Sequence, residues 1–378
     1  DSTQESVHES APPIPERFSA LSHCLAAGNC PSALLVFLAH KTLTQGKSRR
    51  KPRFLNRCDP QISWFNSDID NDIPEPFQVL LYYQYGKIED TEQYLADHRT
   101  LCERLELRGR ILIGDEGLNG TVSGTIPNTE AYIEALHADP FTADMPFKID
   151  PCGEGHIFPK LSIKIRHEIV RLGLPNEADI DPNKTTGTHL APIDFYNAMQ
   201  EENTVLIDAR NDYESELGHF KGALRPNVGN FRDFPQWLDD NADALAGKKI
   251  LTYCTGGIRC EKFSGFIKNS GYDDVYQLDG GIINYSHDPA TRGRNFDGLC
   301  YVFDERVGVE VNHTDSHAII SHCTHCDQPS PRYRNCGWAE CNAQTFICES
   351  CEESFGKFCS ETCRGKFSKK TAKEPDTD

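Results

Sequence analysis

The stretch KKILTYCTGGIRCEKF, residues 248–263, decides the fold of its surroundings. Its beginning, KKILTYC (248–254), has the short apolar run of a buried strand, and EKFSGFIKNSG (261–271) has the pattern of a helix. The connection between them, Thr255–Arg259, contains two glycines. Because ligand sites in open α/β sheets lie outside the carboxyl ends of the strands, the pattern predicts an α/β fold with Cys254 at such an edge.

Several properties of this connection favour a reactive thiol at Cys254. The Gly256-Gly257 pair lets backbone N–H groups turn inward without steric conflict. N–H groups gathered at the start of a helix favour an anion and lower the pKa of a thiol, and the thiolate is the nucleophilic form. We therefore predict that Cys254 is catalytic rather than an inert buried cysteine, in a loop formed by Thr255, Gly256, Gly257, Ile258 and the cationic Arg259. The adjacent Cys260 is either a resolving thiol or a packing residue.

Short apolar strands alternate with helices on both sides of this loop. TVLIDAR (204–210) is typical of a strand and FPQWLDDNADAL (234–245) of a helix. Such alternation predicts a parallel sheet covered on both faces. LIDARNDYESELGHFKGA (206–223) and QLDGGIINY (277–285) resemble the signature of rhodanese domains, which implies a rhodanese domain over residues 186–297.

The same resemblance gives supporting residues around the loop. Asp208, Arg210 and Glu214 are expected to hold the loop architecture rather than to do chemistry, since arginine and carboxylate side chains commonly pair. The loop from Cys254 to Arg259 has six residues, one fewer than the Cys-x5-Arg loop of related cysteine phosphatases. This shorter loop argues against a phosphatase and for a smaller sulfur group on Cys254.

A second domain is predicted before the rhodanese region. FQVLLYYQY (77–85) is typical of a buried strand and DTEQYLADHRTLCERLEL (90–107) of an amphipathic helix. A strand, a hairpin return with Asn119-Gly120 at or near its turn, a second helix and a final strand, LSIKIRHEIV (161–170), follow. The order βαββαβ predicts a ferredoxin-like domain. We place this domain at residues 73–174 and a Pro/Gly-containing linker at 175–185.

Four segments together resemble a more specific family. They are RGRILIGDEGLNGTVSG (108–124), HIFPKLSIKIRHEIV (156–170), DARNDYESELGHF (208–220) and YCTGGIRCEKF (253–263). The chain resembles the rhodanese-domain family of oxygen-dependent tRNA uridine hydroxylases from about Phe77 to Val309. The resemblance implies hydroxylation of the wobble uridine to 5-hydroxyuridine, with molecular oxygen as co-substrate and Cys254 as the essential cysteine. It leaves a persulfide intermediate open and implies neither flavin nor haem.

Two other functions remain open at this point. The chain is alternatively a sulfurtransferase that carries sulfane sulfur as a Cys254 persulfide, or a non-enzymatic interaction protein that senses redox state. The intact Cys254 loop weighs against the non-enzymatic hypothesis. The ferredoxin-like domain weighs against a plain sulfurtransferase, which needs no such platform.

Charge restricts how the chain binds RNA. Its formal net charge is −18, so binding to the tRNA anticodon region requires a local basic patch. Lys160, Lys164, Arg166 and Arg171 are the candidates for this patch, with a plain solvated strand face as the alternative. Glu116 and Asn119 are further polar candidates for RNA contact, although turn formation explains their stretch equally well.

The ends of the chain carry little functional signal. Residues 1–72 are irregular, and we expect a disordered leader there. The apolar run ALLVFLA (33–39) is too short to span a bilayer and lacks the features of a secretory signal. We therefore expect a cytoplasmic protein without a membrane partner. Residues 368–378 are expected to form a disordered tail.

Half of the sixteen cysteines fall in one short region, which we place at residues 298–367. Eight closely spaced thiols are enough for two tetrahedral zinc ions, which would be structural and would supply folding energy to a module too small for a good core. The predicted ligands are Cys323, Cys326, Cys336, Cys341, Cys348, Cys351, Cys359 and Cys363. Interleaved pairing joins the first, second, fifth and sixth of these at one site, and sequential pairing is the alternative. His322 and His325 are expected to flank the site.

Overall fold

The computed structural model describes residues 76–175 and 180–371, so the predicted leader and most of the predicted tail lie outside the described residues. Within these ranges the chain is a mixed α/β protein, as predicted, with a ferredoxin-like sheet, a parallel sheet and a Cys-rich C-terminal region. None of the helices in the described part combines the length and the apolar character needed to cross a membrane. The last helix, α10 (Glu361–Thr371), includes the first residues of the predicted tail.

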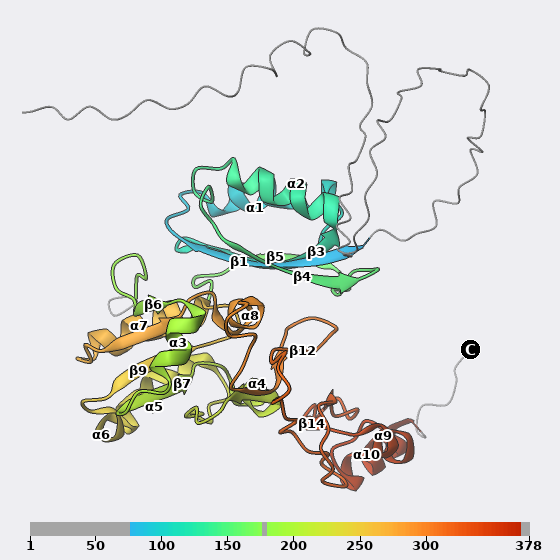
Figure 1. Ribbon diagram of the computed structural model, residues 1–378. Coiled ribbons are helices and arrows are strands. Elements are labelled where there is room, and N and C mark those ends of the chain that lie inside the picture. The colour runs from blue at the N-terminus through green and yellow to red at the C-terminus, as the bar shows by residue number, and fades with distance from the viewer. Residues whose placement is uncertain (1–75, 176–179, 372–378) are drawn as a thin grey trace, which may run out of the picture. The chain divides into compact units, whose positions relative to one another are not determined.

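The first part is one five-stranded sheet with two helices. Its strands lie in the order β4-β1-β3-β2-β5, and Figure 1 shows both helices on the same face of the sheet. The elements are β1 (Phe77–Tyr85), α1 (Thr91–Arg104), β2 (Arg108–Gly114), β3 (Gly117–Thr125), α2 (Ile126–His137), β4 (Phe147–Gly153) and β5 (Leu161–Ile165). The core of this domain lies under the helices and contains Leu80, Tyr82, Ile111 and Tyr132.

One detail of this domain differs from the prediction, and a second refines it. The last strand of the βαββαβ unit is β4, which pairs with β1, whereas the predicted final strand forms only the short β5 along β2. The segment of β4 contains Asp, Pro and Gly, which are typical of turns and hide the strand. The hairpin turn lies at residues 115–116, just before Asn119-Gly120, because Gly114 pairs with Gly117. A Cβ atom on Gly117 would lie 2.1 Å from the carbonyl oxygen of Gln84, so the turn needs this glycine.

A row of side chains crosses the face of this sheet that is not covered by its helices. The strand register places Tyr83, Asn119, Leu112 and Lys164 side by side across four strands. Side chains alternate between faces along a strand, so this row lies opposite to Tyr82 and Ile111 of the core. This face is therefore free to line a cavity.

The second part is a parallel sheet of β6 (Thr188–Leu190), β10 (Val275–Leu278), β9 (Lys249–Tyr253) and β7 (Thr204–Asp208), in that order. Consecutive residues of β9 enter different cores, Ile250 with Phe263 on one face and Leu251 with Phe195 on the other. Both faces are therefore buried, as the alternating pattern predicts. The accompanying helices are α3 (Pro192–Ala198), α4 (Asp212–Leu217), α5 (Phe234–Asp240), α6 (Ala242–Leu245), α7 (Ile258–Asn269) and α8 (Gly281–His287).

The chain then leaves this sheet through short elements. β11 (Phe296–Tyr301) pairs with β8 (Gly218–Phe220) and β12 (Gly308–Glu310). After β12, the described part of the Cys-rich region contains the two-stranded ribbon of β13 (Tyr333–Asn335) and β14 (Gln344–Phe346), with α9 (Glu349–Phe355) and α10. These elements are too short to bury a large apolar core of their own.

Candidate active site

The predicted reactive cysteine lies directly after the central strand β9, at the carboxyl edge of the parallel sheet. Cys254 is fully buried, and the N–H of Gly257 donates to its Sγ at 3.1 Å. Helix α7 begins at Ile258, three residues earlier than the sequence pattern predicts. This early start is made by Gly257, whose φ of 102° suits glycine and few other residues. Cys254 therefore faces the N-terminal end of α7 directly.

Helix α8 holds the loop from the other side. The N–H groups of Ile282 and Ile283 donate to the carbonyls of Cys254 and Thr255 at 3.0 and 3.1 Å. A Cβ atom on Gly281 would lie 2.6 Å from the Cys254 carbonyl oxygen, which explains the Gly-Gly pair before α8. Because α8 takes up these two loop carbonyls, the inward N–H groups are left for the Cys254 sulfur.

The surroundings make Cys254 a thiolate. Burial acts to raise its pKa, but hydrogen bonding from the Cys260 thiol, the charge of Arg259 and the backbone N–H groups of Arg259 and Cys260 outweigh burial and lower the pKa to about 5. Burial and the neighbouring Cys254 raise the pKa of Cys260. At neutral pH, Cys254 is therefore the thiolate and Cys260 its protonated hydrogen-bond donor.

The residues expected to support the loop form buried ion pairs. Arg259 donates to both carboxylate oxygens of Glu214, at 2.5 and 2.9 Å. Arg210 donates to both oxygens of Asp208, at 2.8 and 2.6 Å, and the Tyr253 hydroxyl donates to Asp208 at 2.7 Å. Glu214 compensates the charge of Arg259, so Arg259 is fixed beside the thiolate. Glu214 thus contacts the loop through Arg259. The pair of Asp208 and Arg210 instead contacts Tyr253, the residue before Cys254.

Helix α7 also ties the loop to the ferredoxin-like sheet. Glu261 accepts a hydrogen bond from the Tyr83 hydroxyl at 2.9 Å, and the Tyr85 hydroxyl donates to the Ile258 carbonyl at 3.3 Å. The fully buried Lys262 ammonium lies 2.7 Å from Glu116 and 3.0 Å from Glu168. No sequence pattern marks Lys262, because its partners are distant in the chain.

Glu116 and Glu168, the partners of Lys262, also hydrogen-bond to the backbone of the segment after β5. The Glu116 carboxylate accepts from the Ile169 N–H at 2.7 Å, and Glu168 accepts from the Leu172 N–H at 3.0 Å. Asn119 donates to the Ile169 carbonyl at 3.0 Å. Glu116 and Asn119, considered as polar RNA contacts, therefore position this segment.

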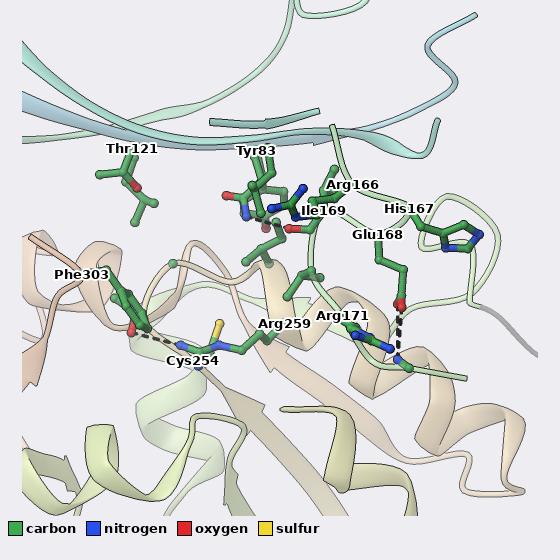
Figure 2. Close-up of a pocket in the computed structure, with 18 of the residues that line it drawn as sticks. Tyr83, Thr121, Arg166, His167, Glu168, Ile169, Arg171, Cys254, Arg259 and Phe303 are labelled. Carbon is green, nitrogen blue, oxygen red and sulfur yellow. Dashed lines mark hydrogen bonds between the residues drawn. The ribbon is translucent and has the colours of Figure 1, made fainter. Parts of the chain in front are cut away.

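A cavity of about 920 Å³ lies above the loop. Its walls come from the free face of the ferredoxin-like sheet, the segment after β5, the Cys254 loop and the chain after β11 (Figure 2). The lining residues include Leu81, Tyr83, Leu112, Asn119, Thr121, Arg166, Arg171, Cys254, Arg259 and Phe303. Of the four basic candidates, Arg166 and Arg171 line the cavity, whereas the exposed Lys160 and Lys164 do not.

The glycines of the loop bring the two walls together. A Cβ atom on Gly256 would lie 2.7 Å from the Leu81 side chain, and one on Gly257 would lie 2.9 Å from the Tyr83 hydroxyl. The Gly-Gly pair therefore allows the close approach of β1 in addition to the turn. Only the turn was expected from the sequence.

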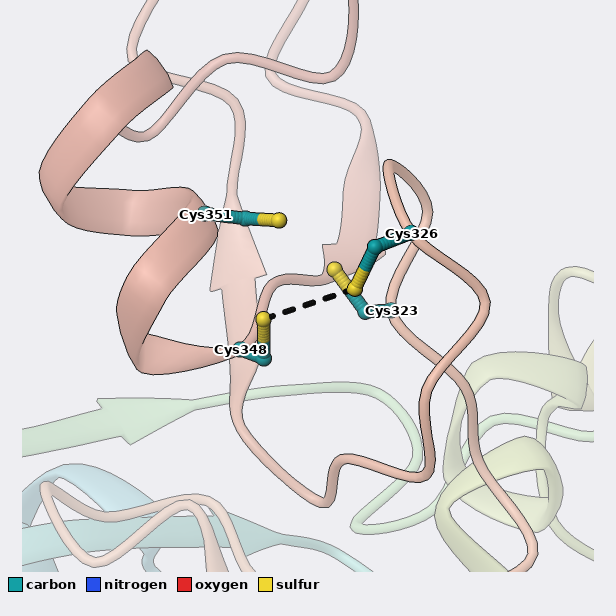
Figure 3. A group of neighbouring side chains, drawn as sticks. All are labelled: Cys323, Cys326, Cys348 and Cys351. Atoms are coloured by element: carbon teal, nitrogen blue, oxygen red, sulfur yellow. Dashed lines mark hydrogen bonds between the residues drawn. The ribbon is translucent and has the colours of Figure 1, made fainter.

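The eight C-terminal thiols form two groups of four with the geometry to hold metal ions. They are Cys323, Cys326, Cys348 and Cys351, drawn in Figure 3, and Cys336, Cys341, Cys359 and Cys363. Within each group all sulfur atoms lie within 4.8 Å of one another. This is the interleaved pairing, one of the two left open by the spacing. His325 flanks the groups, with its Nε2 at 2.9 Å from the Phe358 carbonyl oxygen.

Fold and site together define a rhodanese-domain protein with a preformed thiolate under an acylphosphatase-like sheet. Family models agree with this class. A UPF0176 acylphosphatase-like domain matches residues 77–169, a rhodanese-like domain matches 191–288 and a model described as rhodanase C-terminal matches 297–364.

Curated relatives specify the family. A tRNA uridine(34) hydroxylase of Bacillus pumilus is 51% identical over 288 residues, which are 76% of this chain and 88% of that protein. The protein of the same name from Bacillus velezensis is 50% identical over 300 residues, 79% of this chain and 92% of that one. The chain belongs to the tRNA uridine(34) hydroxylase family. Among solved structures, a rhodanese-like domain from Anabaena is 16% identical with a TM-score of 0.25 over 30% of this chain and 81% of that one, a likeness too weak to add to this assignment.

Proposed function

We propose that this chain hydroxylates uridine 34 of tRNA to 5-hydroxyuridine, with molecular oxygen as co-substrate and Cys254 as the reacting residue. The relatives at half identity carry the name of this activity over most of both chains. The observation that supports Cys254 is its position as a buried thiolate on the wall of a cavity of about 920 Å³. Because hydroxylation oxidises the base, the chain is an oxidoreductase.

The cavity has the size for a nucleotide taken out of its stack. Pockets for small molecules measure about 300 to 1,000 Å³, and enzymes that modify bases extrude the target nucleotide into such a pocket. The thiolate Cys254 then faces the base, while Arg259 and the N–H groups of α7 keep the sulfur charged. Because they lower the pKa of Cys254, the thiolate stays deprotonated at neutral pH.

Basic residues near the cavity are proposed to contact the anticodon region of the tRNA. Arg166 and Arg171 lie on the cavity wall, and Lys164 lies on the same sheet face as Tyr83. Such contacts neutralise backbone phosphates and carry little sequence information. Lys160, just before β5, extends this set. This local group of cations would allow RNA to bind although the net charge of the chain is −18.

Each set of four cysteines is proposed to hold one structural zinc ion. Zn–S bonds of about 2.3 Å in a tetrahedron place the sulfurs about 3.8 Å apart. The Sγ atoms of Cys326 and Cys348 are 3.7 Å apart, and those of Cys359 and Cys363 are 3.6 Å apart. Four thiolates fill a tetrahedral site, so the metal would stabilise the module without touching substrate. Cysteines that bind zinc rather than form disulfides suit a reducing compartment, and we propose that the protein is cytoplasmic.

The test is nucleoside analysis of tRNA from cells that lack this protein, complemented with the wild type, Cys254→Ala or Cys152→Ser. Cys152 lies in β4 and is a cysteine outside the cavity lining. We expect hydroxyuridine to return with the wild type and Cys152→Ser but not with Cys254→Ala. If wobble hydroxyuridine is unchanged without the protein, the proposal fails. Rapid turnover of thiosulfate and cyanide by the purified chain would instead favour a sulfurtransferase.

A further inference from the structure

An aromatic side chain stands exposed on the wall of the cavity that contains Cys254. Phe303 is 44% exposed, among the few large apolar side chains in the described part of the chain with such exposure. It lines the main cavity and also a small neighbouring cavity of about 60 Å³. Figure 2 draws Phe303 on the opposite side of Cys254 from Arg166 and Arg171.

The backbone holds this ring in place. The Val302 N–H donates to the Val307 carbonyl at 2.9 Å, and the Val307 N–H donates to the Asp304 carbonyl at 3.1 Å. Arg306 donates from Nε and an Nη atom to the Asp304 carboxylate at 2.9 and 2.7 Å. Phe303 therefore sits in a short return whose ends are closed by hydrogen bonds.

Two further contacts fix the return against its surroundings. The N–H of Glu305 donates to the Ile157 carbonyl at 3.0 Å, which ties the return to the ferredoxin-like domain. The ring of Tyr301 meets the ring of Phe303 edge-on, with the centroids 5.2 Å apart. The exposure of Phe303 is thus imposed by a well-anchored backbone and does not come from a loose loop.

Exposed apolar surface is unfavourable in water, so a fixed exposed ring inside a cavity favours a ligand that covers it. Proteins that hold unstacked bases use aromatic rings as stacking platforms, with cations nearby for the phosphates. Both parts are present, since Phe303 and the cations Arg166 and Arg171 line one cavity. Thr121 and Thr255 line both cavities with Phe303 and offer hydroxyls to the edge of a base.

We propose that Phe303 is the stacking platform for the pyrimidine ring of the target nucleotide and holds that ring over Cys254. This inference rests on the proposed function, because it supplies the place of the uracil in that reaction. The ring of the base covers the exposed face of Phe303, while its phosphates extend toward Arg166 and Arg171. Phe303 is then a contact of the substrate, distinct from Arg210 and Glu214, which act through the loop.

The first test compares substitutions at Phe303 in the full-length purified chain, with an anticodon stem-loop RNA as substrate. Stacking of one base on an aromatic side chain is worth about 5-fold to 150-fold in affinity, so Phe303→Leu is expected to lower kcat/KM by such a factor. Phe303→Tyr retains the ring and is expected to retain most of the activity. The matched control is Phe367→Leu on α10, because Phe367 is 41% exposed and is not among the residues that line the cavity.

The second test does not depend on turnover. In Phe303→Trp, binding of the stem-loop should quench tryptophan fluorescence beyond the change in the wild type, and an RNA that lacks the base at position 34 should not. No base-dependent quenching, or Phe303→Leu with unchanged kcat/KM, would overturn the stacking role while leaving the hydroxylase intact. Base-dependent quenching in a chain without hydroxylation would instead support the platform and contradict the proposed reaction.

Discussion

Two regions of this chain use cysteine in opposite ways. In the rhodanese domain the fold makes the cysteine reactive, because the start of α7 directs the Gly257 N–H at the Cys254 sulfur while α8 binds the carbonyls of the same loop. In the C-terminal region we propose that the cysteines make the fold by binding metal, because β13, β14 and α9 are too short to form a core. We therefore expect the loss of a thiol to reduce activity in the rhodanese domain and to impair folding in the C-terminal region.

The largest effect is expected for Cys254→Ser, which should abolish hydroxyuridine formation. A serine hydroxyl is not ionised at neutral pH and is a far weaker nucleophile. The free energy of unfolding should change little, since Cys254 is one small side chain in a loop held by α8. The measurement is hydroxyuridine formation by purified protein, with a urea denaturation curve as the control. Activity retained by the variant would show that the loop thiolate is not the reacting group.

Removal of metal should have the next largest effect, confined to the other region. Structural zinc contributes on the order of 10–16 kcal/mol to small metal-dependent folds. Metal analysis of native protein should give about two zinc ions per chain, one for each group of thiols. A strong chelator should make residues 323–363 sensitive to protease and leave the parallel sheet protected.

Single substitutions sharpen the same point. Cys336→Ser should lose one zinc ion and keep the other, because the two groups share no ligand. If the variant lost both ions, or if native protein contained none, the proposal of two independent structural zinc sites would be wrong.

Smaller effects should follow from the ion pairs that support the Cys254 loop. Glu214→Gln leaves the buried guanidinium of Arg259 without its counter-charge, and breaking such a pair costs about 3–5 kcal/mol. The matched control is Asp212→Asn on the same helix, whose pair with Arg225 is partly exposed and worth about 1 kcal/mol or less. Urea denaturation measures both losses. Equal losses for the two variants would remove the structural role given to the Arg259–Glu214 pair.

The smallest expected signal is the titration of Cys254 itself. Its pKa of about 5 means that the thiolate persists from neutral pH down to that value and is protonated below it. The thiolate absorbance lost on acidification, taken as wild type minus Cys254→Ser, should have its midpoint near pH 5. A midpoint near the ordinary pKa of a thiol would mean that the N–H groups and Arg259 do not act on the sulfur as described.

The sequence predicted the parts of the molecule that depend on neighbouring residues. The end of a strand, a glycine pair and a following helix define the Cys254 loop within a few positions of the chain. The spacing of the eight cysteines likewise predicted two groups of four, although the interleaved pairing required the structure. The strand β4 was missed because FKIDPCG contains turn residues in a segment whose partner, β1, lies far away.

Features formed by distant residues were not predictable in this way. Lys262 meets Glu168 across 94 positions, and Tyr83 meets Glu261 across 178. Phe303 gave no signal either, since only the three-dimensional structure shows that its ring faces the cavity of Cys254. The surroundings of the thiol are thus mostly local in the sequence, whereas the cavity above it is formed by distant residues.

The most direct measurement of the central claim is a reaction under isotopically labelled oxygen gas. Purified chain, unmodified tRNA and a thiol reductant are incubated with ¹⁸O₂, and the nucleosides are analysed by mass spectrometry. We expect heavy oxygen in the hydroxyuridine at position 34 with the wild type and none with Cys254→Ser. Hydroxyuridine that carries oxygen from water, or equal labelling by the two proteins, would contradict it.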